Sequence, residues 1–333
     1  MTHYFTSIAL CFLLSMISCQ GQTKKQTMTK NTSSNPLLCD PEKGICEIPD
    51  TTATTDNVTI SAKTKPVRII YFTDPICSSC WGIEPQLKKL KLEYGDQFEI
   101  EYHMGGLLPS WDIYNSGGIG KPSDVAHHWD EVSRYYDMPI DGDVWLEDPL
   151  ASSYPPSIAF KAAQIQDKNK ALAFMRVLRE MVFLEKKNIC KWQHIESAAL
   201  STKLDVVQLK KDYEGQAKQL FQDDLDLAKK MGVRGFPTLF FSNAINEQSM
   251  VYGFKPYNEF ESAIIKLYPQ ATKATIDTSV ESLFSHYKTL TTKEFSILAN
   301  LSTKDAEEAL NKYVDQKKLR KTVTKNGTLW ILN

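Results

Sequence analysis

The chain has little that would mark a nucleic-acid-binding or membrane-spanning protein. Its 39 basic residues are balanced by 40 acidic ones in 333 residues, so no strong positive field exists to attract a polyanion. Beyond the first twenty residues, no apolar run is long enough to cross a bilayer. The length allows two domains, or one domain with a large insertion. We therefore expect a globular protein with no nucleic-acid partner.

The sequence is also poor in the residues that build a zinc site. It contains one C-x-x-C motif, Cys77-Ser78-Ser79-Cys80, and its six histidines are scattered along the chain. A structural zinc site needs four such ligands close together. A redox role for the motif is therefore favoured over half a zinc site. No metal and no organic cofactor is expected, because a redox-active disulfide suffices for this chemistry.

The residues around this motif are typical of a redox site. Residues 67–72 form an apolar run that predicts a buried strand directly before it, and residues 81–90 have helical apolar spacing. Cys77 would then lie at a helix N-terminus, where backbone N–H groups and the helix dipole stabilise a thiolate. Cys80 follows one helical turn later, so it is close enough to attack a mixed disulfide.

The long hydrophobic run of this chain is at its start. Residues 8–17 have the size and composition of a signal-peptide core, and the run ends at Ile17-Ser18-Cys19-Gln20, which resembles the bacterial lipobox. We therefore expect a lipoprotein signal peptide over 1–19 and lipidation of Cys19. The protein would be exported and lipid-anchored to the membrane, facing the periplasm or another extracytoplasmic space. The first seven residues lack Lys and Arg, so an uncleaved anchor or a mis-assigned start remains open.

Export would also account for the pattern of cysteines. If Cys19 carries lipid and Cys11 leaves with the signal, two local pairs and one odd cysteine remain, as suits an oxidising compartment. These five are Cys39, Cys46, Cys77, Cys80 and Cys190. Turn-forming residues between Cys39 and Cys46 allow the chain to reverse and bring the two together. A second redox-active pair, a structural disulfide and half of a zinc site all remain open for them.

The rest of the pattern predicts one sheet domain that is interrupted by helices. Residues 20–64 are rich in Lys, Thr, Ser, Gln and Asn, as expected of a flexible tether that carries the Cys39/Cys46 arm. Residues 65–109 and 231–268 together predict a βαβ unit followed by two strands and a helix. Residues 110–230 between these parts show helical periodicity.

A separate module is predicted at the C-terminus, over residues 277–333. Three short helices are expected at 280–287, 292–301 and 303–316, followed by a β-hairpin that turns at Asn326-Gly327. This arrangement resembles a winged helix. The module carries a basic cluster of Lys317, Lys318, Arg320, Lys321 and Lys325. A solvated basic face is favoured over DNA binding for this cluster.

Three segments resemble the DsbA-like branch of the thioredoxin-fold proteins. Residues 73–82, Thr-Asp-Pro-Ile-Cys-Ser-Ser-Cys-Trp-Gly, are similar to the active-site signature of that family. Residues 232–239 are similar to the loop that carries its cis-proline, and residues 153–157 to the start of its helical insertion. The resemblance covers roughly residues 65–268. It implies an α/β thioredoxin fold with a large helical insertion, followed here by the winged-helix-like module.

The resemblance also implies a role for particular residues. Cys77 would be the nucleophilic cysteine and Cys80 the resolving one. Pro237, in the cis form, would lie beside the disulfide, and the backbone of Phe236 would pair with an extended substrate peptide. Trp81 follows the pair directly and is expected to shield one side of it and to contact the substrate.

Two functions follow from the resemblance. The dipeptide Ser78-Ser79 replaces the Pro-His of DsbA, so the direction of electron flow stays open. One function is a thiol–disulfide oxidoreductase that acts on protein thiols and disulfides and depends on an unidentified recycling partner. Within the branch, however, the chain is similar to the SpxH (YjbH-like) adapters, which present a transcription factor to the ClpXP protease. The alternative is therefore a redox-sensing cytoplasmic adapter that binds a protease client.

Overall fold

A computed structural model of the chain describes residues 39–40, 45–47, 65–113 and 120–333. The predicted signal peptide and Cys19 lie outside the described residues, as does most of the predicted tether. Within the described part, no helix is long and apolar enough to cross a membrane.

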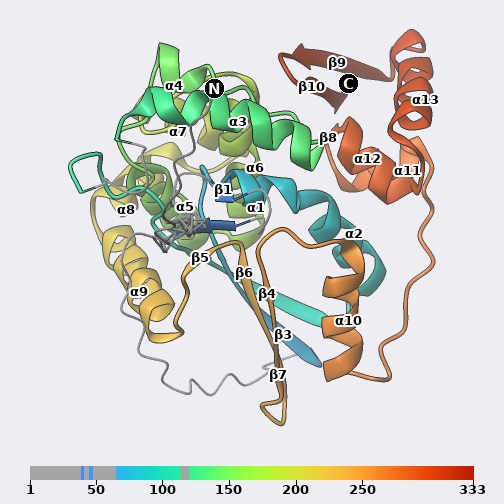
Figure 1. Ribbon diagram of the computed structural model, residues 1–333, viewed down its shortest axis with the longest axis horizontal. Helices are drawn as coiled ribbons and strands as arrows, with labels where there is room; N and C mark the ends of the chain where they lie inside the picture. Colours follow the sequence, from blue (N-terminus) through green and yellow to red (C-terminus); the bar gives the residue numbers. More distant parts are fainter. Residues whose placement is uncertain (1–38, 41–44, 48–64, 114–119) are drawn as a thin grey trace, which may run out of the picture. The chain divides into compact units, whose positions relative to one another are not determined.

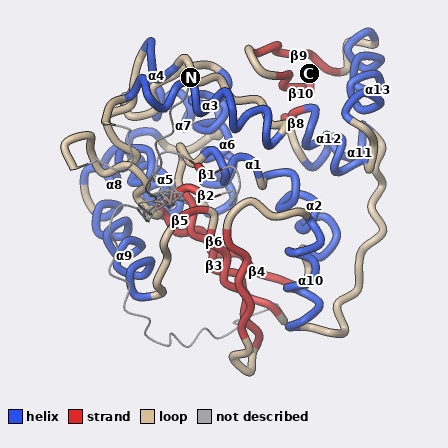
Figure 2. Tube along the Cα trace, viewed as in Figure 1, coloured by secondary structure: helices blue, strands red, loops and turns tan. Residues whose placement is uncertain are grey.

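The central sheet has four strands in the order β4-β3-β6-β7 (Figures 1 and 2). β3 (Val67–Thr73) pairs in parallel with β4 (Phe98–Met104) and antiparallel with β6 (Thr238–Asn243). β7 (Gln248–Tyr252) completes the sheet beside β6. The predicted parallel βαβ unit is therefore confirmed, although the insertion separates its two strands from the other two.

β3 is covered on both faces because it lies in the middle of this sheet. Ile69 and Tyr71 enter a hydrophobic cluster with side chains of α2 (Glu84–Tyr94) and α10 (Tyr257–Leu267). Ile70 and Phe72 enter a second cluster, which includes both cysteines of the C-x-x-C motif and much of the helical insertion. The strand therefore ends between two hydrophobic clusters, and the cysteines that follow it are packed in one of them.

The single helix predicted after the first cysteine is two helices. α1 (Ser78–Gly82) ends at Ile83, whose φ of −90° and ψ of 0° lie outside the helical range, and α2 begins at the next residue. Pro85, in the first turn of α2, has no backbone N–H to continue the α1 hydrogen-bond pattern. The break therefore follows from Pro85, which a prediction from apolar spacing alone does not take into account.

In the described residues of the insertion, seven helices lie between the two halves of the sheet domain; Figure 1 shows their arrangement. They are α3 (Pro122–Tyr136), α4 (Val144–Glu147), α5 (Tyr154–Gln166), α6 (Lys168–Leu184), α7 (Trp192–Ser201), α8 (Val206–Glu214) and α9 (Gln216–Lys230). The helical character predicted for 110–230 is confirmed. α6 carries Arg179, which is buried.

The C-terminal module forms its own hydrophobic cluster. Its elements are α11 (Val280–His286), β8 (Thr289–Thr291), α12 (Thr292–Ala299), α13 (Thr303–Asp315), β9 (Leu319–Thr324) and β10 (Gly327–Leu332). The three helices and the hairpin lie where they are predicted. The short strand β8 was not predicted, and it extends the hairpin to a sheet of order β8-β10-β9.

Buried ion pairs attach this module to the sheet domain. Glu294 caps α12 in a capping box with Thr291, and its carboxylate is fully buried. It accepts hydrogen bonds from Lys88 on α2 at 2.6 Å and from Arg176 on α6 at 2.7 and 2.9 Å. One carboxylate of the module therefore joins a helix of the sheet domain to a helix of the insertion.

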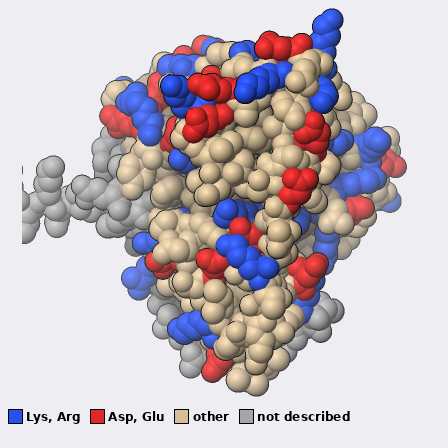
Figure 3. Space-filling view, turned by 90° about the vertical axis from the view of Figure 1, so that its right-hand side faces the viewer, with Lys and Arg blue, Asp and Glu red and all other residues tan. Residues whose placement is uncertain are grey.

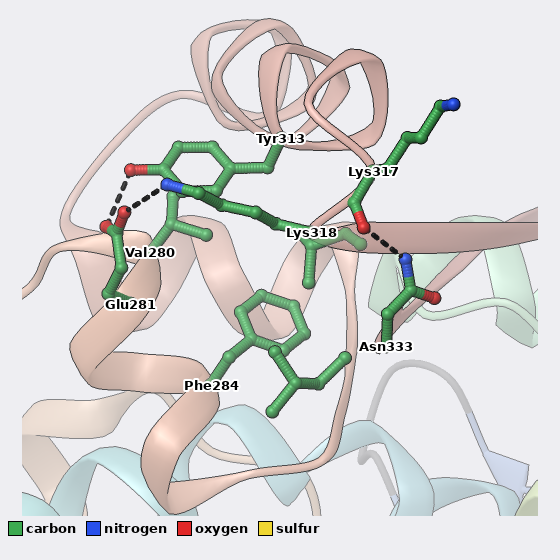
Figure 4. Close-up of a pocket in the computed structure, with 9 residues that line it drawn as sticks. Val280, Glu281, Phe284, Tyr313, Lys317, Lys318 and Asn333 are labelled. Atoms are coloured by element: carbon green, nitrogen blue, oxygen red, sulfur yellow. Dashed lines mark hydrogen bonds and ion pairs between the residues drawn. The ribbon is translucent and has the colours of Figure 1, made fainter.

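A shallow hollow of about 310 Å³ opens on the outside of this module (Figure 4). Val280 and Phe284 of α11 line it with apolar surface. At its rim the carboxylate of Glu281 accepts hydrogen bonds from the Tyr313 hydroxyl at 2.6 Å and from Lys318 at 3.2 Å. Glu281 and Lys318 therefore form an ion pair at the rim, which Lys317 also lines.

Part of the predicted basic cluster is engaged in local contacts. Lys325 forms ion pairs with Asp130 at 2.6 Å and Asp143 at 2.7 Å, both on the insertion side. Figure 3 shows acidic and basic side chains interspersed over one face of the molecule. This distribution agrees with the balanced composition, and it offers no extended positive surface on that face.

Candidate functional site

The two cysteines of the motif lie at the junction of β3 and α1. Cys77 is the N-cap residue of α1, and its Sγ accepts a hydrogen bond from the Cys80 backbone N–H at 3.1 Å. Both side chains are fully buried. The predicted placement of the pair between a buried strand and a helix start is therefore confirmed.

A buried arginine of the insertion supplies positive charge to this junction. Arg179 on α6 donates hydrogen bonds to Thr73 Oγ1 at 2.7 Å and to the Asp74 carbonyl at 3.3 Å. It also donates to Glu84 Oε1 at 2.5 Å. Only 2% of Arg179 is exposed, so water screens its charge little.

The two thiols share hydrogen bonds and titrate as a unit. Burial raises the pKa of Cys77, and so do its hydrogen bond to Cys80 and the charge on Cys80. Burial also opposes ionisation of Cys80, but the hydrogen bond from the Cys77 thiol and the charge of Arg179 lower its pKa below the ordinary value. The site therefore favours one thiolate, held by the insertion's arginine.

A buried carboxylate lies directly before the pair in the chain. Asp74 Oδ1 accepts a hydrogen bond from the Ile76 N–H at 3.0 Å, and Oδ2 accepts from the Leu107 N–H and the Ser153 hydroxyl, both at 2.8 Å. Burial raises the pKa of Asp74 to about 6, although these hydrogen bonds and Arg179 oppose the shift. Asp74 therefore changes charge near neutral pH, inside the site, where it can accept or give up a proton.

Trp81 packs inside the protein. Its indole N–H donates to the Pro139 carbonyl at 3.0 Å, and its ring stacks on Phe183 at a centroid distance of 5.5 Å. The Arg176 guanidinium lies 4.5 Å from the centre of the ring. The side chain is fully buried, which agrees with shielding of the pair. Contact of Trp81 with a substrate remains a prediction, and the burial of the ring argues against it.

The predicted proline loop contains a cis peptide bond, between Phe236 and Pro237. The Phe236 ring is fully buried and packs against Gly105, where an added Cβ would lie 1.8 Å from the ring. Its backbone forms the short strand β5 (Gly235–Phe236). Phe236 also belongs to the hydrophobic cluster that contains Cys77. The loop and the cysteine pair, far apart in sequence, therefore meet in one core.

Sequence reasoning missed Arg179. Its partner Glu84 is mostly buried, because it pairs with Arg179 and, at 3.2 Å, with Lys88. One signal for Arg179 exists in the sequence, since it lies on the apolar stripe of α6 with Met175 and Val182. A charged residue within such a stripe indicates a buried partner, but it does not say which one.

No three His, Cys, Asp or Glu side chains gather into a possible metal site in the residues that the structure describes. The three alternatives for Cys39 and Cys46 remain predictions, because nothing is described of their side chains.

Comparisons with known proteins agree with this geometry. The family model described as Thioredoxin matches residues 71–262. A protein of Halalkalibacterium halodurans named ClpXP adapter protein SpxH is 36% identical over 302 residues, which cover 89% of this chain and 97% of that protein. The chain belongs to the SpxH family of thioredoxin-fold proteins. The protein of the same name from Bacillus subtilis is 31% identical, over 80% of this chain and 89% of that one.

A solved structure shows the same fold with a more distant sequence. It is a putative protein disulfide isomerase from Nitrosomonas europaea, with a TM-score of 0.51, 19% identity, and coverage of 62% of this chain and 96% of that one. The thioredoxin fold with a large helical insertion is therefore established for this SpxH-family chain. At this identity the similarity concerns the fold alone.

In this SpxH-family site, replacing Arg179 tests whether the insertion tunes the thiolate. Arg179→Met is expected to raise the pKa of Cys80 and to slow disulfide exchange at neutral pH by roughly tenfold, because the buried guanidinium charge favours the thiolate. Thiolate absorbance measured against pH gives the shift. Arg179→Lys keeps the positive charge and should retain most of the wild-type exchange rate. If the pH profile of thiolate absorbance is unchanged in Arg179→Met, Arg179 does not stabilise the thiolate.

Proposed function

We propose that the protein exchanges disulfides with protein substrates through Cys77 and Cys80. The observation that carries this proposal is a fully buried cysteine pair at the start of α1, beside the buried guanidinium of Arg179, whose charge lowers the pKa of Cys80. A proton transfer between the two sulfur atoms places the charge on Cys77. The Cys77 thiolate then attacks a substrate disulfide, a mixed disulfide forms, and one substrate thiolate leaves.

Cys80 completes the reaction. Its thiolate, favoured by Arg179, attacks the Cys77 sulfur; the mixed disulfide breaks, and the second substrate thiolate leaves. Two electrons pass to the substrate, and the Cys77–Cys80 disulfide remains. The same steps in reverse oxidise a substrate dithiol. No metal or organic cofactor takes part, but a recycling partner must restore the starting state of the pair.

The rate of exchange with a glutathionylated peptide, compared between wild type and Cys77→Ser, tests this proposal. The direction follows from the reduction potential of the pair, measured in glutathione buffers. A potential near about −120 mV would make the protein an oxidant, and one near about −270 mV a reductant.

A redox-sensing adapter is the second candidate, favoured by two observations. The relatives at 36% and 31% identity are named ClpXP adapter proteins. In addition, ion pairs run without interruption from Arg179 through Glu84 and Lys88 to Glu294 of the C-terminal module. Such a chain offers a route by which the charge of the cysteine pair could affect a partner-binding module. A cellular phenotype that survives replacement of both Cys77 and Cys80 by serine would favour the adapter over the oxidoreductase.

We also propose that Cys19 carries a lipid that anchors the protein at the extracytoplasmic side of the membrane. The lipobox-like run and the tether-like composition after it support this proposal. Cells fed labelled palmitate should incorporate label into the wild-type protein, and Cys19→Ser should lose essentially all of it. Cys11→Ser is the matched control and should keep its label. An unlabelled wild-type protein in the soluble fraction would instead support the cytoplasmic alternative.

A further inference from the structure

The strand before the cis peptide bond is paired with a distant part of the same chain. β2 (Ile45–Glu47) runs antiparallel to β5, with Cys46 opposite Phe236 and Glu47 opposite Gly235. The two strands form one sheet with β1 (Cys39–Asp40), in the order β1-β2-β5. A segment of the N-terminal region therefore occupies the backbone edge of the proline loop.

The register of this small sheet brings cysteines together. Cys39 lies opposite Cys46 in the β1–β2 pair, so Cys39, Cys46 and Phe236 follow one another across three strands. Directly opposite residues in antiparallel strands have Cα atoms about 4.5–5.5 Å apart. A disulfide requires Cα atoms about 4.4–6.8 Å apart. The backbone of Cys39 and Cys46 therefore meets the distance requirement of a disulfide.

The same strand also approaches the redox helix. Cα atoms of β2 lie within 8 Å of Cα atoms of α1, the helix that contains Cys80 and is capped by Cys77. Pairing of an extended segment to a strand edge fixes its register, as in peptide recognition by strand addition. The register places a cysteine opposite Phe236, the position at which the backbone of an extended substrate is expected to pair.

We propose that the Cys39–Cys46 pair is a second redox pair, which exchanges a disulfide with Cys77–Cys80 through a Cys46–Cys77 mixed disulfide. This inference rests on the proposed role of Cys77 as the exchange nucleophile. The Cys77 thiolate attacks the Cys46 sulfur of a Cys39–Cys46 disulfide; the new S–S bond forms, and Cys39 leaves as a thiolate.

The second half of the exchange returns the mixed disulfide to two separate pairs. The Cys80 thiolate attacks the Cys77 sulfur, and Cys46 leaves as a thiolate. The Cys39–Cys46 pair gains two electrons, and the Cys77–Cys80 pair loses them. The two protons that Cys77 and Cys80 give up are balanced by two protons that bind to the released thiolates of Cys39 and Cys46. No outside oxidant or reductant enters this exchange.

Trapping of the mixed disulfide tests the inference. The full chain with Cys80→Ser cannot resolve it, so oxidation with oxidised glutathione should give a Cys46–Cys77 linked peptide in an unreduced digest analysed by mass spectrometry. We expect at least about tenfold more of this link than of Cys39–Cys77 or Cys77–Cys190, because effective concentration depends on geometry and Cys46 is on the strand that pairs with Phe236 and approaches α1, whereas Cys39 is one strand further out. Adding Cys46→Ser should abolish the link, and adding Cys190→Ser should not.

Exchange with an external substrate separates this inference from the proposed function. A chain with Cys39→Ser and Cys46→Ser keeps Cys77 and Cys80, so it should still exchange with a glutathionylated peptide. Active exchange by that chain, together with no Cys46–Cys77 link in the trapping variant, would overturn the inference and leave the proposed function intact. If the wild-type protein does not exchange with the glutathionylated peptide, the proposed function itself is overturned. Equal trapping of Cys39 and Cys46 would overturn the register argument.

Discussion

Disulfide exchange with a glutathionylated peptide is expected to fall at least about a thousandfold in Cys77→Ser, on the scale of losses seen when a nucleophile is removed. A serine hydroxyl stays protonated at neutral pH and cannot form the mixed disulfide. We assign the attack to Cys77 because it is the first cysteine of the pair and caps the N-terminus of α1, whereas Cys80 lies one turn further along the helix. Stopped-flow or gel-shift kinetics with the peptide in excess measure the loss.

Cys190→Ser is the matched control for this experiment. Cys190 donates a hydrogen bond to the Ser152 carbonyl at 2.8 Å, and burial raises the pKa of its thiol to about 11. It therefore carries little thiolate at neutral pH, and its replacement should leave the exchange rate within about twofold of wild type, since reactivity follows the thiolate. An equal loss in both variants would indicate that the protein unfolds rather than that Cys77 is the nucleophile.

The free energy of unfolding of the C-terminal module should fall by about 3–5 kcal/mol in Glu294→Gln, the usual cost of removing one partner of a buried ion pair. The change leaves Lys88 and Arg176 buried without their shared carboxylate, and the capping box of α12 loses its charge. Hydrogen exchange of α12 and α13, together with urea unfolding, measures the effect. Glu308→Gln is the matched control on α13, because its pair with Lys304 is exposed and spans 4.0 Å. That control should change stability by less than about 1 kcal/mol.

The pH dependence of stability gives an independent test of Glu294. Burial opposes its charge, but Arg176 and Lys88 lower its pKa from 4.5 to about 2. Because the folded pKa is the lower one, its stabilisation is complete above about pH 4.5 and is lost as the pH falls toward about 2. The loss is on the order of 3 kcal/mol. Glu294→Gln should lack this part of the acid dependence, whereas equal acid profiles in both proteins would contradict the ion-pair assignment.

Apolar runs and turn-forming residues in the sequence correctly predicted β3 and the C-terminal hairpin. The strand at β3 follows from a continuous apolar run, and the C-terminal hairpin follows from Asn326-Gly327, which favours the tight turn between β9 and β10. β8 escaped prediction because three residues carry no measurable period. The break between α1 and α2 escaped because helical spacing continues across Ile83, while the missing N–H of Pro85 interrupts the hydrogen bonds.

The sequence by itself determined where the redox-type cysteine pair lies, because two thiols at C-x-x-C spacing follow a predicted buried strand, and it is this pair to which we assign the proposed disulfide exchange. Only the tertiary structure decided what stabilises that chemistry. Arg179 is about a hundred positions from Cys80, and the β2–β5 register sets Cys46 against Phe236 across nearly twice that gap in the chain. Contacts between such distant residues depend on how helices and strands pack. Local spacing does not encode that packing, so the charge at the cysteine pair and the partner strand at the proline loop become visible only in the fold.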